Sequence, residues 1–205
     1  MIAVIDYGVG NLRSVHKAFE KCGFSAQITN NKDIINKSNA LVLPGVGAFP
    51  QAMNTLKQTG LDKIIHENIK NGKPFLGICL GMQLLFSESE EFGHEKGLNI
   101  ISGKVKKFQV KLKIPHMGWN QLEINQNCPL LKKVTPGAYM YFVHSFYAKP
   151  DNPGDIAAET EYGIKFTAMV WNKNVFACQF HPEKSQDEGL KIIRAFGEMA
   201  IGSRL

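Results

Sequence analysis

The sequence contains no apolar run long enough to cross a lipid bilayer. A membrane-spanning helix needs about 20 consecutive apolar residues, and every apolar stretch of this chain is much shorter. The first six residues, Met-Ile-Ala-Val-Ile-Asp, lack the basic segment of a signal peptide and reach an acidic side chain at once. We therefore expect a cytoplasmic protein that begins with a strand and makes no membrane contact.

Cysteine is also scarce, with four residues among 205, and none stands in a Cys-x-x-Cys pair or at the spacing of zinc ligands. We expect free thiols, no metal site and no cofactor. Cys22 closes a helical pattern and Cys178 lies in an apolar strand pattern, so we interpret both as small buried hydrophobic residues.

A long basic tract is missing too, although the formal net charge is +6. The densest basic cluster contains Lys104, Lys106, Lys107, Lys111 and Lys113. At strand spacing several of these share one face, which is typical of a solvated edge strand protected by lysines. The alternative is an electropositive rim for an acidic partner or an anionic substrate. Nothing resembles a nucleic-acid-binding module, so we expect no nucleic-acid partner.

Strand and helix patterns alternate through the first half of the chain, and glycines mark the turns. This order predicts a parallel sheet with helices on both faces. The predicted strands are 2–6, 24–29, 40–43 and 75–78, and the predicted helices are 12–22 (with Asn11 as N-cap), 50–59, 61–71 and one directly after Cys79.

From residue 103 onward, short strands separated by turns dominate, and helical periodicity returns only at 128–133 and 185–201. We predict one mixed α/β domain over residues 1–205, built on a largely parallel, open, flavodoxin-like sheet with antiparallel strands in its second half. The additional predicted strands are 104–108, 121–124, 139–143, 156–160, 164–170 and 175–179, and 151–155 is a predicted exposed loop.

The most informative motif is Gly-Ile-Cys-Leu-Gly at residues 77–81, which follows an apolar strand pattern. It predicts a sharp strand-to-helix turn with Cys79 at its tip. The flanking glycines let the backbone bend and leave room for a substrate. The first N–H groups of the next helix carry partial positive charge, which favours the thiolate. Cys79 is therefore the predicted nucleophile.

A second motif, His181-Pro182-Glu183, lies in the last strand-to-helix connection. Residues two apart in extended backbone point to the same side, so Glu183 can hold the imidazole of His181 while His181 faces Cys79. In an open α/β sheet, ligands collect at the carboxyl ends of the strands, where both motifs belong. A nucleophile, a base and a carboxylate that orients the base predict cleavage of an acyl bond.

A third motif, Pro44-Gly45-Val46-Gly47, follows another predicted strand. Acyl transfer needs backbone N–H donors aimed at the developing oxyanion. Glycines here let the Val46 N–H turn inward, and the N–H of Leu80 is the predicted second donor. A plain strand-to-helix turn is the alternative interpretation.

Together these residues resemble the class I glutamine amidotransferases, which carry a Cys-His-Glu triad, and the resemblance covers nearly the whole chain. It rests also on matching segments at 6–11, 43–49, 115–120, 141–145 and 179–185. The resemblance implies that glutamine is the substrate and that Cys79, His181 and Glu183 are catalytic. It further implies substrate contacts from Gly45, Gly47, Gln83, Glu91, Ser145 and Phe146.

Glu91 is the least specific of these contacts. Its carboxylate suits the α-ammonium group of glutamine, but Glu88, Glu90 and Glu91 also form an acidic run that is typical of a solvated surface.

The resemblance also implies a partner. Ammonia near neutral pH is mostly ammonium, which is not nucleophilic, and this chain is expected to have no synthase domain of its own. The matching subunits pair with a separate (β/α)8-barrel cyclase, so we expect a heterodimer with an internal ammonia passage. Asn11, Trp119 and Lys184 match docking positions; a core tryptophan is the alternative for Trp119.

In this family the partner controls the glutaminase. Our hypothesis is that the Gly45–Val46 peptide is poorly oriented in the free subunit and turns its N–H inward when the partner is loaded.

Three alternatives stay open from the sequence. One is a related glutaminase that serves another synthase, such as one that aminates a sugar. Another is a cysteine hydrolase or peptidase on a related sheet, against which Gln83 and Glu183 argue. The third is a non-enzymatic subunit that has kept the fold, against which the intact triad argues.

Overall fold

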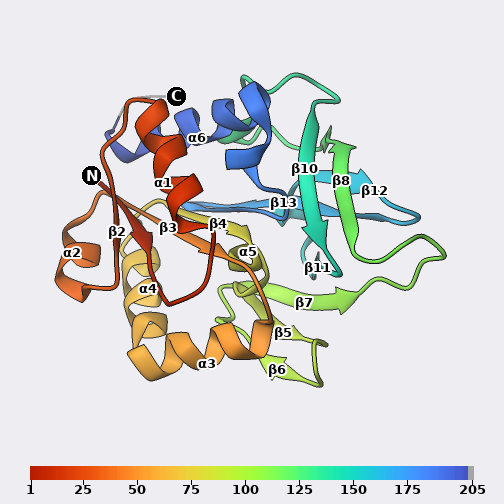
Figure 1. Ribbon diagram of the computed structural model, residues 1–205, viewed down its shortest axis with the longest axis horizontal. Helices are drawn as coiled ribbons and strands as arrows, with labels where there is room; N and C mark the ends of the chain where they lie inside the picture. Colours follow the sequence, from red (N-terminus) through yellow and green to blue (C-terminus); the bar gives the residue numbers. More distant parts are fainter. Residues whose placement is uncertain (203–205) are drawn as a thin grey trace.

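An eight-stranded sheet forms the centre of the computed structural model, which describes residues 1–202 (Figure 1). Its strands are β1 (Ile2–Ile5), β2 (Ala26–Thr29), β3 (Ala40–Gly45), β4 (Phe75–Cys79), β9 (Glu123–Ile124), β12 (Ile156–Glu161), β13 (Lys165–Asn172) and β14 (Val175–Cys178).

The strand order is β2-β1-β3-β4-β14-β13-β12-β9. The pairings from β2 to β14 are parallel and those from β14 to β9 are antiparallel. The predicted fold class, a mixed and largely parallel open sheet with antiparallel strands from the second half, is therefore confirmed. The last three residues of the predicted domain, 203–205, lie outside the described residues.

Helices cover both faces of this sheet (Figure 1). Val15 and Phe196 belong to the core cluster on one face, and Leu56 to the cluster on the other. Adjacent strand residues alternate between the two clusters, Val4 facing one and Ile5 the other. The first face carries α1 (Leu12–Lys21) and α6 (Gln186–Ala200), and the second carries α2 (Lys32–Lys37), α3 (Phe49–Thr59) and α4 (Leu61–Lys70).

Two smaller sheets flank the central one (Figure 1). The first contains β11 (Phe146–Pro150), β7 (Ile101–Lys107), β5 (Phe86–Ser89) and β6 (Glu95–Lys96), in that spatial order. The second is an antiparallel ribbon of β8 (His116–Gln121) and β10 (Tyr139–His144). The remaining short elements are α5 (Leu80–Gln83), η1 (Pro129–Leu131), η2 (Pro153–Asp155) and η3 (Pro182–Lys184).

Several expected elements differ from the structure. The helix expected after Cys79 is a single turn, α5, because β5 begins at Phe86. The segment 128–133 forms only a 3-10 turn, η1. Helix α2 was not predicted; the side chain of Asn31 accepts hydrogen bonds from two N–H groups of its first turn. The predicted loop 151–155 includes η2, whose Asp155 is buried.

The expectation of a lysine-protected edge strand is wrong. Strand β7, which carries Lys104, Lys106 and Lys107, pairs with β11 on one side and with β5 on the other. Lys104 forms an ion pair of 2.6 Å with Glu88 of β5. These lysines therefore lie on the solvent-facing side of a strand that has a paired strand on each side.

Within residues 1–202, none of the helices combines the length and apolarity needed to cross a membrane. All four cysteines are free thiols; Cys178 is fully buried, as expected, whereas Cys22 is only half-buried.

Candidate active site

Cys79 ends β4 in a backbone conformation that side chains rarely adopt, with φ 56° and ψ −109°. Its flanking glycines have no positive φ, so they do not supply the bend that the sequence pattern assigned to them. They are required by packing: a Cβ on Gly81 would overlap the carbonyl oxygen of Leu43, and one on Gly77 would lie 2.8 Å from the carbonyl oxygen of Gly81. Close backbone packing thus holds the strained cysteine at the carboxyl end of the sheet.

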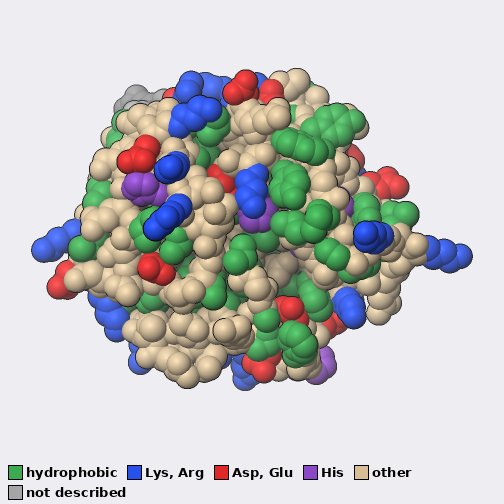
Figure 2. Space-filling view, viewed as in Figure 1, with side chains coloured by type: hydrophobic (Ala, Val, Ile, Leu, Met, Phe, Trp, Pro, Cys, Tyr) green, Lys and Arg blue, Asp and Glu red, His purple; other side chains and the backbone are tan. Residues whose placement is uncertain are grey.

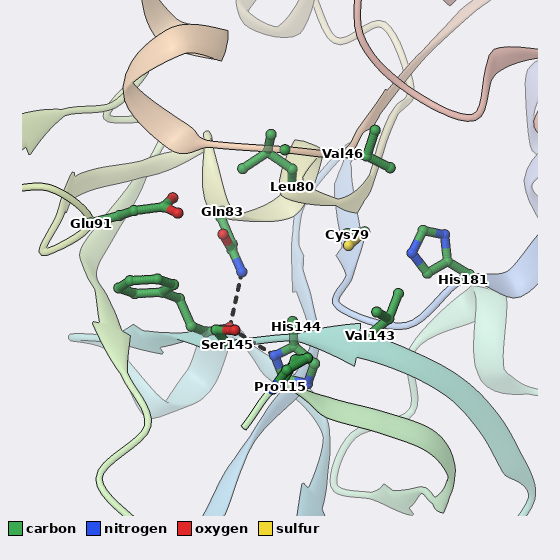
Figure 3. A pocket seen from close by; sticks show the side chains of 12 residues that line it. Val46, Cys79, Leu80, Gln83, Glu91, Pro115, Val143, His144, Ser145 and His181 are labelled. Carbon is green, nitrogen blue, oxygen red and sulfur yellow. Dashed lines mark hydrogen bonds between the residues drawn. The ribbon is translucent and has the colours of Figure 1, made fainter. Parts of the chain in front are cut away.

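His181 follows β14, and its ring faces Cys79 (Figure 3). Its Nδ1 lies 2.8 Å from Oε1 of Glu183, and the two side chains are 2% and 0% exposed. Because the carboxylate accepts, Nδ1 carries the hydrogen. Among the described residues, Nε2 of His181 has no hydrogen-bond partner although it is buried. An imidazole oriented on one side and free on the other is the geometry of a general acid or base.

The charge state of His181 follows from its neighbours. Burial alone lowers its pKa, but Cys79 and Glu183 outweigh burial and raise it. Groups that carry negative charge stabilise the imidazolium when they lie close to it in a site that excludes water. His181 is therefore protonated at neutral pH, with a proton available for a leaving group.

Asn11 precedes α1 but does not cap it, which corrects the sequence-based expectation. Its Nδ2 instead lies 3.5 Å from Oε1 of Glu183, to which it donates. Asn11 therefore contacts the same carboxylate oxygen that holds the ring of His181.

The residues predicted to supply the oxyanion donors, Val46 and Leu80, line the same cavity as Cys79 and His181. The side chain of Val46 is 43% exposed at its edge. Gly45 beneath it is buried, since a Cβ there would overlap the hydroxyl of Tyr7 and lie 2.9 Å from Cβ of Leu80. Gly47 has a φ of +94°, a conformation that favours glycine. This turn therefore packs directly on the residue that follows the nucleophile.

These residues surround a cavity of about 380 Å³, a volume suited to a small molecule. Gly45 and Glu183 are not in its lining, since they lie behind Leu80 and His181 respectively. The lining brings together the predicted Val46, Gly47, Cys79, Leu80, Gln83, Glu91, Ser145, Phe146 and His181. It also contains Pro115, Val143 and His144, which were not predicted as site residues.

Gln83 and Glu91 reach the cavity with part of their hydrogen-bonding capacity already used. The Nε2 of Gln83 donates to the carbonyl oxygen of Phe146 at 3.0 Å (Figure 3). It also donates to Oε1 of Gln179 at 2.9 Å. The Oε2 of Glu91 accepts from the N–H of Phe49, the first residue of α3, at 2.8 Å. Each therefore has one oxygen left for a ligand.

Gln179 is a site residue that sequence reasoning missed. It is fully buried, and its Nε2 lies 3.8 Å from Sγ of Cys79. The available signal was an amide side chain directly after a run of apolar strand residues, where an unpaired polar group would be costly.

Apolar side chains gather on the surface over β8 and β10 (Figure 2). Met117, Trp119 and Tyr139 are 62%, 46% and 54% exposed, so the core interpretation of Trp119 is wrong. The ring of Trp119 stands edge-on to Tyr141 at 6.0 Å, and Nζ of Lys184 lies 5.9 Å from the centre of the Tyr141 ring. Aromatic and cationic side chains beside the triad form a surface suited to a partner.

In the described part of the chain, no group of three or more His, Cys, Asp or Glu side chains is arranged to hold a metal ion.

Comparison with known proteins places this geometry in context. The family described as "Glutamine amidotransferase class-I" matches residues 3–199. The chain is 51% identical to "Imidazole glycerol phosphate synthase subunit HisH" of Syntrophotalea carbinolica, covering 97% of this chain and 100% of that protein. It is 46% identical to the protein of the same name from Bacillus subtilis, covering 100% and 99%. The corresponding protein of Methanothermobacter thermautotrophicus is 50% identical, covering 97% and 98%.

Solved structures give the same fold at lower sequence identity. One described as "Crystal structure of glutamine amidotransferase" superposes with a TM-score of 0.77 at 19% identity, covering 98% of this chain and 99% of that chain. A chain of "Structure of PurLQS from Thermotoga maritima" gives a TM-score of 0.76 at 18% identity, covering 95% and 96%.

Proposed function

Since the chain belongs to the class I glutamine amidotransferases, and within them to the HisH subunits of imidazole glycerol phosphate synthase, we propose that Cys79, His181 and Glu183 hydrolyse glutamine here and supply ammonia to a partner subunit. The observation that carries this proposal is the buried His181–Glu183 pair, which faces a strained cysteine across one cavity.

The first half-reaction releases ammonia. The sulfur of Cys79 attacks the side-chain amide carbon of glutamine, and the carbonyl electron pair moves onto oxygen. The N–H groups of Val46 and Leu80 stabilise that oxyanion. His181 gives its Nε2 proton to the amide nitrogen, the C–N bond breaks, and ammonia leaves a thioester on Cys79.

The second half-reaction restores the site. His181, now neutral, takes a proton from water, and the resulting hydroxide attacks the thioester carbon. The C–S bond breaks, glutamate leaves, and the sulfur and the imidazolium return to their starting forms. Glu183 holds Nδ1 of His181 throughout, so Nε2 always faces the reaction.

The amino-acid end of glutamine belongs at the other end of the cavity. The free carboxylate oxygen of Glu91 suits the α-ammonium group, and the free amide oxygen of Gln83 accepts a further donor. The backbone of Ser145 and Phe146, together with Gly47 across the cavity, completes this pocket, and Gly45 supports it from behind Leu80.

HisH proteins are subunits of a larger synthase, so this chain works with a partner. We place a (β/α)8-barrel cyclase on the exposed surface of Met117, Trp119 and Tyr139, with Lys184 as an ion-pair donor and Asn11 behind Glu183. The heterodimer would form imidazole glycerol phosphate and AICAR in histidine biosynthesis. Four free thiols are compatible with a reducing cytoplasm, and residues 1–205 act as a single domain in this proposal.

The direct test is an assay of the full-length chain with a purified cyclase partner of this type. We expect glutamine-dependent formation of imidazole glycerol phosphate and release of glutamate in equal amounts. A complex that forms product from ammonia but never from glutamine contradicts the proposal.

Glu183→Gln should slow glutamine hydrolysis by about 10³–10⁴-fold, because an amide no longer enforces the Nδ1–H form of His181. The carboxylate is also one of the two groups that raise the pKa of His181, so this pKa should fall in the variant. Steady-state kinetics and titration of the His181 ring by NMR check both effects. His181→Ala is the more severe reference, and an E183Q variant with wild-type turnover would remove Glu183 from the triad.

The glutaminase should be slow in the isolated chain and faster by orders of magnitude in the loaded complex. The reason is the Gly45–Val46 peptide, whose N–H must point into the cavity for the oxyanion to form. Glutamate release is measured with the chain alone, with the partner, and with the partner saturated by its substrate. Equal rates in the three mixtures would contradict the switching hypothesis.

A further inference from the structure

Two buried histidines beside the cavity have no part in the mechanism above. His116 of β8 and His144 of β10 are 3% and 6% exposed and face each other directly in the two-stranded ribbon. Nδ1 of His116 lies 3.0 Å from Nε2 of His144, so one ring donates to the other.

The hydrogen-bond partners fix where each proton lies. Nδ1 of His144 is 2.7 Å from the carbonyl oxygen of Phe146, which only accepts, so this nitrogen carries a hydrogen. In a neutral ring Nε2 then accepts, which requires the hydrogen of His116 to lie on its Nδ1. The Nε2 of His116 is left as an acceptor, and Nδ2 of Asn120 is 3.3 Å from it.

Asn120 is oriented by contacts of its own. Its Nδ2 also donates to the carbonyl oxygen of Glu161 at 2.7 Å, and its Oδ1 accepts from the N–H of Gln121 at 2.9 Å. An amide held in this way presents a donor, not an acceptor, to His116. Two neutral Nδ1–H rings are therefore the arrangement that satisfies every group in the chain of bonds.

The surroundings oppose a charge on either ring. His116 stacks on Tyr162 with ring centres 4.1 Å apart, and Phe108 and Phe166 lie about His144 at 5.2 Å each. Positive charge on His116 or His181 would also repel a charge on His144. Burial lowers the pKa of His116 to about 4. Burial also lowers the pKa of His144 to about 3; the hydrogen bond to the Phe146 carbonyl oxygen opposes this shift, and His116 and His181 add smaller lowering effects.

The chain of bonds ends at the cavity wall. The carbonyl oxygen of Phe146 accepts from both His144 and Gln83 (Figure 3). Gln83 in turn bonds Gln179, whose Nε2 reaches the sulfur of Cys79. The backbone turn between β10 and β11, which lines the cavity at Ser145 and Phe146, is therefore held by two hydrogen bonds to the Phe146 carbonyl oxygen, one from His144 and one from Gln83.

We propose that His116 and His144 form a positioning pair, two neutral Nδ1–H imidazoles that hold the Ser145–Phe146 wall of the cavity in place for glutamine. The kinetic part of this inference rests on the proposed glutaminase function. The proton positions do not, and they are tested separately.

The spectroscopic test uses the full-length chain with ¹⁵N-labelled histidine, of which it has six residues. Ring nitrogen shifts distinguish Nδ1–H, Nε2–H and cationic imidazole, and neutral histidine in water prefers Nε2–H. We expect His116 and His144 in the Nδ1–H form at pH 7 and still neutral at pH 5. Either ring found as Nε2–H or as a cation at pH 7 overturns the proposal.

The kinetic test compares variants in the complex with the partner. His116→Phe keeps an aromatic ring but removes the donor, whereas His116→Asn places an amide nitrogen near the former Nδ1. We expect H116F to raise KM for glutamine about tenfold, with a smaller change in kcat. In H116N, KM should return most of the way to the wild-type value. H144F should raise KM at least as much. H66F, at an exposed histidine of α4, is the matched control.

Thermal unfolding of each variant separates positioning from loss of fold. If H144F does not fold, the comparison of H116F with H116N decides. An unchanged KM for glutamine in folded H116F overturns the proposed positioning role. An equal rise of KM in folded H116F and H116N overturns it too. Absence of glutamine hydrolysis in the wild-type complex would instead overturn the proposed function and leave the proton positions to NMR.

Discussion

Cys79→Ala should abolish glutamine-dependent synthesis in the reconstituted complex and leave ammonia-dependent synthesis intact. No thioester forms without the sulfur, and removal of a nucleophile from a catalytic triad costs about 10⁶-fold in turnover. Alanine has the same backbone constraints as cysteine, so the strained turn with φ 56° is no worse in the variant. The measurement is product formation with glutamine and, separately, with ammonium salt at alkaline pH.

Cys178→Ala is the matched control for that experiment. Cys178 is fully buried in β14, beside Ile78 of β4, and it lies outside the cavity lining. The Cys178→Ala variant should keep both glutamine-dependent and ammonia-dependent synthesis. If Cys79→Ala loses both, the substitution has disturbed folding or docking; if it keeps glutamine-dependent synthesis, Cys79 is not the nucleophile.

Gly81→Ala should inactivate the glutaminase and destabilise the protein together. The added Cβ would overlap the carbonyl oxygen of Leu43, a backbone atom of β3 that cannot rotate away. Helix α5 must then move off the sheet and carry the Cys79 turn with it. We expect the free energy of unfolding to fall by about 1–3 kcal/mol. Misplacement of the thiol should lower glutamine hydrolysis by about 10²-fold or more.

Denaturant unfolding and glutamine hydrolysis measure these two effects of Gly81→Ala. Gly154→Ala is the control, because φ there is not positive and the nearest contacts of the added Cβ are side-chain atoms of Asn152, at 3.1 Å or more, and not backbone atoms. Wild-type stability and turnover in Gly81→Ala would show that β3 can move to make room for the added Cβ. Close packing of Gly81 on Leu43 would then not be what holds the Cys79 turn in place.

The parallel part of the central sheet and the meeting of Cys79 with His181 were predictable from local signals. Apolar runs followed by helical periodicity indicate alternating strands and helices, and parallel strands end at one edge, so Cys79 and His181 meet there. The Glu183 contact was predicted from a spacing of two residues in extended backbone; the contact is present, but Pro182–Lys184 is a 3-10 turn, so that reason is wrong. Each of these inferences needs only short-range sequence information and one general rule of topology.

What failed depended on partners distant in the sequence. Whether β7 lies at an edge is decided by β11, which begins almost 40 residues after β7 ends. Asn11 had the local features of an N-cap, but its Oδ1 caps no N–H group of α1 and its Nδ2 donates to Glu183, which is distant in the sequence. Gln179 reads as a strand residue until Gln83 and Cys79 are placed beside it. Sequence patterns indicate local conformational preference, whereas the positions of β7, Asn11 and Gln179 are determined by contacts with residues distant in the sequence.

The turn at Gly45–Gly47 has consequences for the evolution of substrate range. Gly45 is enclosed by Tyr7 and Leu80, whereas a Cβ at Gly47 would meet nothing within 4 Å, and the side chain of Val46 is 43% exposed. Gly47 has space but a φ of +94° that favours glycine, so substitution at this turn is confined to Val46. A descendant that accepted a bulkier amide would acquire its new contacts at Val46 and keep the packing of Gly45 and Leu80 beside Cys79 unchanged.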